Sequence, residues 1–594
     1  MSTDVLPSNS FKSHLNLDFF EAMAKRSDAA PARWRQPFLA WLDGIEKGWG
    51  IPVLIVGFAA TWMLFLMIAY LSGDLHPDVL ETWSVGRNFA WGNAKHPPLM
   101  GWIANAWTLV FPLTDWSFRL LAMTNAAVAL WAVDLIARRF VRGDKRAVVL
   151  LLLMLLPAYQ FHAQRFNANT VLLAVWPLAT YCFLRSFETR QIKWAAAAGA
   201  LAAIAMLGKY YSVFLIGGFV FAAACHPQRR IYFRSPAPWV STLVGVVVLA
   251  PHLHWLATTG AAPFEYAMVA HGGRKFWPSV LEAGKFPLEV AAILAIPALS
   301  WVLMAESRLR RFPADFRAMN SGLWLLFLVF AGTIGFPPIV AVTFGTDMTS
   351  LWAMQGLFPV AILVVCGASY PIERFYTVNW TVLVIGIALV AVTIAAPVHA
   401  LYRNAYGYEE RRNFYRLAAL ELTRRWHQVS RFPLSAISGD NTLAFATGFY
   451  SPDHPRYRRP FALQYQWPIP PQHAFENGWA AMCFSDDEVC GEWIRNVRAT
   501  APDAICFDFD VTDSLWGQPG VTARIVAVMV LPREGKAGVS AMLPHDGVGG
   551  LQRTTPLGIR GGAIRKRRSG ERGRLKENPT IGFAGTNPHK FQAG

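Results

Sequence analysis

The chain has 594 residues, of which 54% are hydrophobic and only 16% are charged, with a mean hydropathy of +0.29. Soluble proteins carry about 25% charged residues, so this composition excludes an ordinary soluble enzyme and predicts a polytopic membrane protein. The formal net charge is +17, and the tail 551–594 holds ten Lys and Arg residues against two acids. Its basic run has no interleaved aromatic residues, so we expect a disordered charged tail and no nucleic-acid partner.

The N-terminal segment, residues 1–50, is polar and of mixed charge, and the first apolar run begins near Ile51. The apolar core of a cleavable signal peptide lies closer to the N-terminus, so we expect this segment to remain on the cytoplasmic side. Apolar runs able to cross roughly 30 Å of hydrocarbon predict a membrane domain over 51–400. We expect about eleven spans, near 51–72, 117–137, 147–160, 169–186, 193–208, 211–226, 236–256, 287–305, 319–337, 350–370 and 376–398.

The orientation of these spans follows from their loops, because Lys and Arg favour cytoplasmic loops. Basic connections follow every second span, at 138–146, 185–193, 229–234 and 308–311. The other loops are then expected outside, namely 73–116 (the first loop), 161–168, 257–286 and 338–349. An odd number of spans places the polar region after residue 402 outside as well.

That polar region, residues 402–545, begins with an amphipathic, basic stretch and continues as short strand-like and turn-rich sequence. It predicts a small extracytoplasmic α+β domain, so the expected fold class is a mostly α transmembrane bundle with this domain appended. If the region is extracytoplasmic, Cys483 and Cys490 are candidates for a disulfide that closes a short loop.

The first loop combines acids, cations, tryptophans and a rigid proline pair at a membrane surface. It supplies Asp78, Glu81, Lys95 and His96, and Pro97-Pro98 follows directly. Ionisable residues at membrane depth are costly and are candidates for function. Further polar and aromatic candidates fall at the outer ends of other spans, namely Arg165, Asn169, Lys209, Tyr210, His252, His254 and Trp255. Their common side favours one outward-facing cavity rather than a conduction path.

One nearly lone acid among several cations, in an apolar surround, suits the transfer of a sugar from a lipid-phosphate donor. The leaving phosphate is already anionic, so it needs stabilisation by cations or a divalent metal. The acceptor hydroxyl needs a general base, for which one carboxylate suffices. A soluble glycosidase instead requires a pair of carboxylates.

A family resemblance is carried by the run Asp78 … Trp83 … Trp91-Gly92 … His96-Pro97-Pro98-Leu99. It resembles the first outer-loop signature of the bacterial dolichyl-phosphate-mannose-protein mannosyltransferase-like proteins of the GT-C superfamily. Members include aminoarabinose transferases and rhizobial lipopolysaccharide galacturonosyltransferases. The likeness covers roughly residues 50–400, with a core signature over 78–255. Its later motifs are Arg165-Phe166-Asn167, Gly208-Lys209-Tyr210, Pro251-His252-Leu253-His254-Trp255 and Trp352, with a fainter match at Phe449-Tyr450 and Pro452 to Pro455.

The resemblance implies a multi-pass inverting glycosyltransferase of the bacterial inner membrane, with its site and carboxy-terminal domain in the periplasm. Its expected partners are a polyprenyl-phosphate sugar donor, an envelope glycolipid or polysaccharide acceptor, and membrane lipids. Asp78 matches the family's acidic loop residue, proposed as base or metal-associated acid, and Glu81 is expected beside it as a catalytic residue. The donor phosphate is expected to meet His96, Lys209, Arg165 and Lys95. The expected substrate-binding residues are Asn169, Tyr210, His252, His254 and Trp255.

The chain departs from the family pattern at three acidic positions, where it has Val79, Lys95 and Asn169. These losses weaken any metal site, so a divalent cofactor stays open and no metal ligand is assigned. Glu81 lies one helical turn from Asp78 and is expected to supply part of the missing charge.

Two other functions stay open on the sequence. One is a multispan transporter or flippase of a lipid-linked or anionic solute, and the other is a non-catalytic binder of a lipid-linked sugar. Transporters often show internal repeats and polar residues at mid-membrane, whereas here the polar residues fall at outer ends. The alternative for Asp78 itself is a helix N-cap, with Glu81 completing a pattern like a capping box.

Overall fold

The computed structural model describes residues 33–273, 275–346, 349–457 and 477–532. The expected tail 551–594 lies outside the described residues, as do the first 32 residues of the N-terminal segment. Two parts of the expected carboxy-terminal domain, 458–476 and 533–545, also lie outside them.

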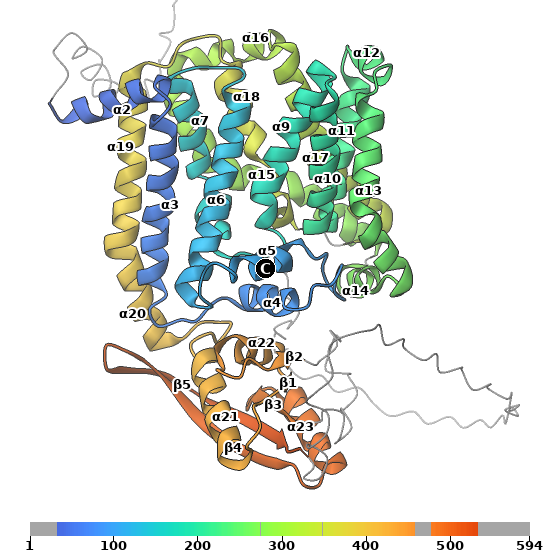
Figure 1. The fold of residues 1–594 in the computed structure, drawn as a ribbon. Helices are drawn as coiled ribbons and strands as arrows, with labels where there is room; N and C mark the ends of the chain where they lie inside the picture. Colours follow the sequence, from blue (N-terminus) through green and yellow to red (C-terminus); the bar gives the residue numbers. More distant parts are fainter. Residues whose placement is uncertain (1–32, 274, 347–348, 458–476, 533–594) are drawn as a thin grey trace, which may run out of the picture. The chain divides into compact units, whose positions relative to one another are not determined.

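A helical bundle forms most of the described chain (Figure 1). Within the described residues, seven helical runs are long and apolar enough to cross a membrane: α3 (Gly50–Ala69), α6 (Asp115–Ala137), α9 (Val171–Thr189), α13 (Ala237–Thr258), α15 (Phe276–Ala305), α17 (Ser321–Phe344) and the continuous run of α19 (Arg374–Val390), η6 (Ala391–Ala395) and α20 (Ala396–Tyr406). These runs confirm the prediction of a multi-pass, mostly helical protein.

Four further apolar segments leave the number of spans a prediction. Two are bent pairs: α7 (Asp144–Met154) with α8 (Pro157–Gln160) and η2 (His162–Gln164), bent by 76°, and η5 (Ser350–Gly356) with α18 (Phe358–Gly367), bent by 46°. A proline lies in the first turn of both α8 and α18 and removes a backbone donor at each break. The other two, α10 (Ile192–Gly208) and α11 (Val213–Cys225), are shorter helices. At 1.5 Å per residue they reach only about 26 Å and 20 Å.

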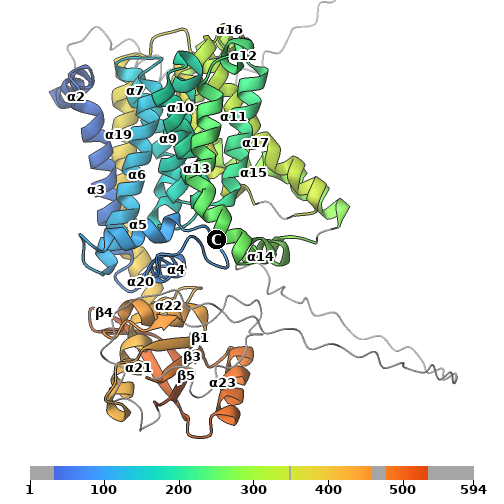
Figure 2. The same cartoon turned by 45° about the vertical axis from the view of Figure 1, so that its right-hand side comes forward.

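Short helices lie at the two ends of this bundle. They are η1 (Arg33–Arg35), α2 (Gln36–Glu46), α4 (Pro77–Gly86), α5 (Leu99–Trp107), η3 (Tyr210–Ser212), α12 (Arg229–Phe233), α14 (Ala262–His271), η4 (Glu306–Arg311) and α16 (Phe312–Arg317). Figures 1 and 2 place α2, α12 and α16 at one end and α4, α5 and α14 at the other. Basic α12 and η4 thus share an end with α2, as the alternation of basic loops predicts.

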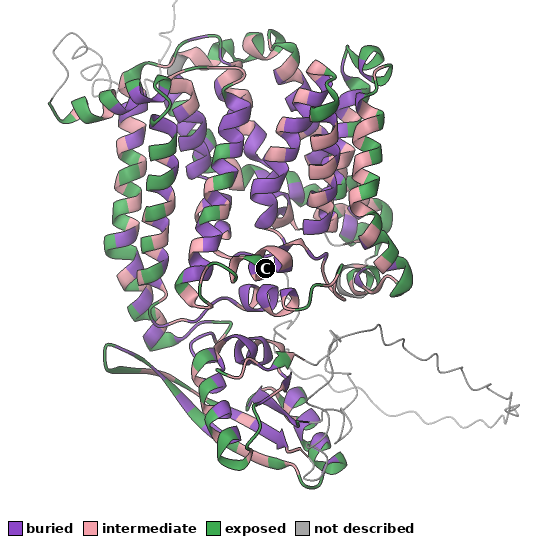
Figure 3. Cartoon of the chain, viewed as in Figure 1, coloured by how far each residue is buried: buried purple, intermediate pink, exposed green. Residues whose placement is uncertain are grey.

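Figure 3 shows many exposed residues along the flanks of the bundle, and large apolar residues are among them. On α13, for example, Trp239 is 67% exposed and Leu243 is 65% exposed. Large contiguous apolar surfaces are rare on soluble proteins, so these flanks are the surfaces expected to face lipid.

The carboxy-terminal segment, here the described residues after Tyr406, contains a small mixed sheet. Its elements are α21 (Tyr415–Val429), β1 (Ala436–Gly439), α22 (Asn441–Tyr450), β2 (Arg456–Tyr457), β3 (Trp479–Phe484), α23 (Glu488–Thr500), β4 (Ile505–Leu515) and β5 (Gln518–Val530). The strand order is β2-β1-β3-β5-β4; β1 runs parallel to its neighbours and β5 antiparallel to both of its own. This confirms the α+β prediction. Cys483 and Cys490 form the expected disulfide.

A buried polar joint ties the first loop to α21 and α22. Asp74 Oδ2 accepts a hydrogen bond from the Arg416 backbone N–H at 2.7 Å. Asp115, at the start of α6, forms an ion pair with the Arg416 side chain and accepts a hydrogen bond from the Tyr450 hydroxyl at 2.9 Å. Two largely buried carboxylates therefore share one guanidinium, whose side chain is about half exposed.

Crowding in this joint makes stability depend on the protonation of Asp74. Burial raises the pKa of Asp74 to about 7, and Asp115 adds to the rise, while Arg416 opposes it. The unfolded chain loses this proton near pH 4, whereas the folded chain keeps it to about pH 7. The group's contribution to the free energy of unfolding is therefore full at low pH and falls as pH rises through that window.

We expect Asp74→Asn to flatten this pH dependence and to be the more stable protein at pH 8, by on the order of 2 kcal/mol. Thermal unfolding in detergent between pH 5 and pH 8 would measure the difference. Asp510→Asn, on an exposed position of β4, is the matched control. Parallel pH profiles for wild type and Asp74→Asn would contradict the assignment.

Candidate active site

Helix α4 carries both predicted catalytic acids, Asp78 and Glu81. The helix begins at Pro77, whose fixed φ suits a first helical position and whose missing N–H needs no partner there. The preceding residue, His76, is the N-cap: its Nδ1 accepts a hydrogen bond from the Asp78 backbone N–H at 3.2 Å. The alternative in which Asp78 caps the helix is therefore wrong, because the proline starts the helix before it.

The Asp78 carboxylate is held by an asparagine turn ahead of α9. Asn167 is buried, and its side-chain Nδ2 donates to Asp78 Oδ2 at 3.0 Å. The other side of the same amide, Oδ1, accepts from the backbone N–H groups of Asn169 and Thr170, both at 3.0 Å. Asn167 stood in a quoted motif but was given no role in the sequence analysis. Its bond to Asp78 joins segments far apart in the chain, which no local pattern shows.

The same turn also contacts Lys209. The Asn169 side-chain oxygen accepts a hydrogen bond from Lys209 Nζ at 2.5 Å, and that ammonium lies 4.1 Å from the centroid of the Trp352 ring. Lys209 is the residue directly after α10, so the end of that helix positions it beside Asn169. The structure thus brings together three predicted residues, because Asp78 is bonded to Asn167 and Lys209 to Asn169 of the same turn.

Glu81 and Lys95 form a second pair beside this one. Lys95 Nζ lies 2.9 Å from Glu81 Oε2, while within the described residues Glu81 Oε1 is buried without a hydrogen-bond partner. Burial raises the pKa of Glu81. Burial alone would lower the pKa of Lys95, but Glu81, Tyr266 and Asp78 together outweigh it, so the net direction is upward. Lys95 therefore stays positively charged. Of the two carboxylates, Glu81 is paired with an ammonium at 2.9 Å, whereas Asp78 is bonded to an amide.

The pKa values of His96 and Lys209 are both lowered, by burial and by nearby ammonium groups. Burial lowers the pKa of His96 well below its ordinary value, and Lys95 and Lys209 add to the fall. Its imidazole is then neutral and can donate one hydrogen bond. Burial lowers the pKa of Lys209 to about 7, with Lys95 adding to the fall and Asp78 opposing it. Lys209 therefore changes charge near neutral pH.

Tyr210, His252 and Trp255 link the first loop to α13. His252 Nδ1 contacts the Trp91 carbonyl, so that nitrogen carries the proton, and Nε2 accepts from the Tyr210 hydroxyl at 3.1 Å. Trp255 stacks on His252 and leaves no room for a side chain at Gly92, where a Cβ would lie 2.5 Å from its ring. These three residues hold the loop that carries Lys95 and His96.

Two predicted residues are not drawn into these contacts. His254 lies on an exposed face of α13, away from His252. Arg165 is half-buried, and among the described residues its side chain makes no ion pair or hydrogen bond. Their assigned roles stay predictions.

A divalent metal does not fit the described side chains. Among the residues that the structure describes, no three or more His, Cys, Asp or Glu side chains gather as metal ligands would. Asp78 is bonded to an amide, and an ammonium already lies beside Glu81. The cationic side chains beside these two carboxylates are Lys95 and Lys209.

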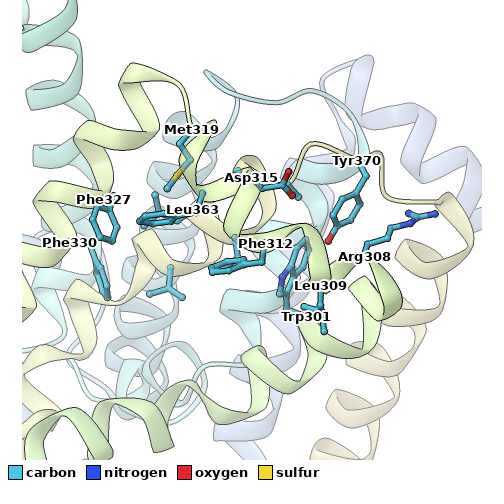
Figure 4. Close-up of a pocket in the computed structure, with 15 residues that line it drawn as sticks. Trp301, Arg308, Leu309, Phe312, Asp315, Met319, Phe327, Phe330, Leu363 and Tyr370 are labelled. Carbon is cyan, nitrogen blue, oxygen red and sulfur yellow. The ribbon is translucent and has the colours of Figure 1, made fainter. Parts of the chain in front are cut away.

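An apolar cavity of about 160 Å³ lies elsewhere, among α15, α16, α17 and α18 (Figure 4). Aromatic and aliphatic side chains line most of it, together with Arg308 and Asp315. Helix α16 lies at the opposite end of the bundle from α4 (Figures 1 and 2). The cavity contains none of the predicted site residues, so we do not identify it with the active site.

Comparisons with known proteins match part of the chain that contains this site, beginning after Asp78 and Glu81. The family model described as Dolichyl-phosphate-mannose-protein mannosyltransferase matches residues 95–255, which include Lys95, Asn167 and Lys209. The lipid A galacturonosyltransferase RgtD of Rhizobium johnstonii is 24% identical over 204 residues, which are 34% of this chain and 42% of RgtD. The match thus spans less than half the length of that relative.

Among solved structures, ArnT from Cupriavidus metallidurans in the apo state has a similar fold. The TM-score is 0.50 at 14% identity, covering 81% of this chain and 98% of ArnT. The structure of ArnT bound to undecaprenyl phosphate gives a TM-score of 0.48 at the same identity and coverage. At this identity the likeness to the apo structure shows the fold alone.

Proposed function

We propose that this chain, whose matches point to the GT-C superfamily of membrane glycosyltransferases, moves a sugar from a polyprenyl-phosphate donor to an envelope glycolipid. The proposal places it in the bacterial inner membrane with the α4 end of the bundle facing the periplasm. The basic α12 and η4 at the other end support this orientation. The name of RgtD supports a lipid A-like acceptor over a polysaccharide.

The observation that carries the proposal is the arrangement around Asn167 and Asn169. One carboxylate, Asp78, is bonded to the side chain of Asn167, and one ammonium, Lys209, is bonded to the side chain of Asn169, two residues further along the same turn. Transfer from a lipid phosphate needs both groups, because the base acts on the acceptor while the cation acts on the leaving group.

In the proposed reaction, Asp78 accepts the proton of an acceptor hydroxyl. The hydroxyl oxygen bonds to the anomeric carbon as the bond from that carbon to the phosphate oxygen breaks, with inversion. Lys209 and Lys95 stabilise the charge that develops on the departing polyprenyl phosphate, and neutral His96 donates a hydrogen bond to it. Glu81 holds Lys95 in place rather than acting as the base.

Mass spectrometry of envelope lipids tests the proposal. Compared with the wild type, a deletion strain is expected to lack one sugar on a glycolipid and to accumulate the corresponding polyprenyl-phosphate sugar. Complementation with the intact gene should restore both. A donor that changes membrane leaflet while every glycolipid stays intact would indicate a flippase, and unchanged lipids throughout would indicate a non-catalytic binder.

A further inference from the structure

The three residues before α4 are all in contact with the carboxy-terminal segment. The Asp74 backbone N–H donates to the Arg412 carbonyl at 3.0 Å. The Leu75 backbone N–H donates to the Tyr450 hydroxyl at 2.9 Å. His76 Nε2 lies 3.7 Å from Glu410 Oε1, and its other ring nitrogen caps the helix at Asp78.

Tyr450 is the centre of these contacts. Its hydroxyl accepts from Leu75 and donates to Asp115 Oδ1, each at 2.9 Å, so it joins the first loop to α6 through a residue of α22. Asp115 is also paired with Arg416, which fixes the acceptor of the Tyr450 bond. The hydroxyl thus both accepts and donates a hydrogen bond. Removing it leaves the Leu75 N–H without its acceptor and Asp115 Oδ1 without this donor.

The rest of α4 is packed against the same segment. Trp83 meets the Phe449 ring edge to face, with centroids 5.4 Å apart. Arg87, the C-cap of α4, donates to the Pro455 carbonyl at 3.1 Å. Both ends of the helix that carries Asp78 are therefore bonded to residues encoded more than 300 positions later in the chain.

We infer that Tyr450, supported by Arg416, is a positioning residue that sets where the Asp78 carboxylate stands. The inference rests on the proposed function, since it assigns a role in that reaction. Tyr450 acts on the start of α4 through its bond with the Leu75 backbone N–H. Because Asp78 is three residues from Leu75, releasing that backbone group lets the first turn of α4 move. Misplacement by about 1 Å is enough to cost roughly 10²-fold in rate.

Tyr450→Phe tests this inference, and Tyr457→Phe is its matched control. The Tyr457 hydroxyl also makes a short hydrogen bond, to Asn441 Oδ1 at 2.7 Å, and this bond lies within the carboxy-terminal segment. We expect kcat to fall about 10- to 100-fold in Tyr450→Phe with the donor KM unchanged. Tyr457→Phe should keep its kcat within about threefold of the wild type. Equal kcat losses in the two variants would show a merely structural role.

Amide hydrogen exchange gives a readout that does not need activity. In Tyr450→Phe, peptides covering residues 74–86 should exchange at least about fivefold faster, while peptides from α9 and α10 stay unchanged. Unchanged exchange at 74–86 would overturn the inference. If the wild-type protein transfers no sugar, the proposed function fails, and exchange still decides whether Tyr450 holds α4.

Should Tyr450→Phe fail to fold, Arg416→Gln provides the second variant. It keeps the Arg416 backbone N–H that donates to Asp74 but removes the side-chain ion pairs with Asp115 and Asp74. The expected pattern is the same, with faster exchange at 74–86 and a lower kcat at constant donor KM. Arg416→Lys, which keeps the charge, should recover part of both losses. Wild-type exchange in Arg416→Gln would contradict the support assigned to Arg416.

Discussion

Replacing Asp78 with Asn is expected to lower kcat by about 10²- to 10⁴-fold, the range that a general base contributes. The affinity for the donor should change little, because the donor phosphate is assigned to Lys209 and Lys95 and not to Asp78. Asparagine has the same shape, and its amide oxygen can still accept from Asn167. The loss therefore reports basicity rather than geometry.

The measurement is transfer by the purified protein, followed by mass spectrometry, with donor affinity determined separately on a non-transferable phosphodiester analogue. Asp510→Asn is the control, since Asp510 is exposed on β4. Measuring kcat of Glu81→Gln beside Asp78→Asn shows which of the two carboxylates acts as the base. If that variant lost kcat while Asp78→Asn kept it, the roles of the two carboxylates would have to be exchanged.

The second large effect is expected from Lys209→Met, which should weaken donor binding about 30- to 100-fold at pH 6.5. This corresponds to about 2–3 kcal/mol, as expected for a charged hydrogen-bonded pair that loses one partner. The Lys209 side chain is anchored by Asn169 and Trp352, so no neighbouring cation can take its place without moving. Lys285→Met, at an exposed position on α15, is the matched control.

The affinity of the wild-type protein for the donor is expected to fall as pH rises above 7, because Lys209 then loses its charge. With a pKa of about 7 in the free protein, Lys209 is charged below pH 7 and becomes neutral above it. A bound phosphate favours the charged form, so donor Kd should be constant below pH 7 and rise by up to about tenfold per pH unit above it. A phosphodiester ligand does not titrate in this range. A pH slope that persisted in Lys209→Met would assign the titration to another group.

The sequence predicted the helical segments well because apolar run length is a local property. Each expected span coincides with a helical segment, but the bends at Pro157 and Pro359 depend on packing, so the span count could not be fixed. The cap at His76 was a missed local signal, since a proline just inside a helix start is a common pattern.

The site was partly predictable for the same reason. Asp78, Lys209 and Asn169 were identified by type and position, whereas the pairing of Lys95 with Glu81 depends on a loop folding back across 14 residues. Asn167 lies 89 positions from the carboxylate it holds. The separation of His254 from His252 follows from helical period, since residues two apart on a helix point to different faces.

The bond between Leu75 and Tyr450 also has a consequence for the order of synthesis. The two residues are 375 positions apart. At about 5–20 residues per second, α4 leaves the ribosome roughly 20–75 s before its partner exists. Helix α4 is therefore made before Tyr450 can bond to Leu75, and it lacks this contact while the later helices are inserted. A chain that stops short of α22 would keep every acid and lysine of the site and still lack the residue that we infer to position Asp78.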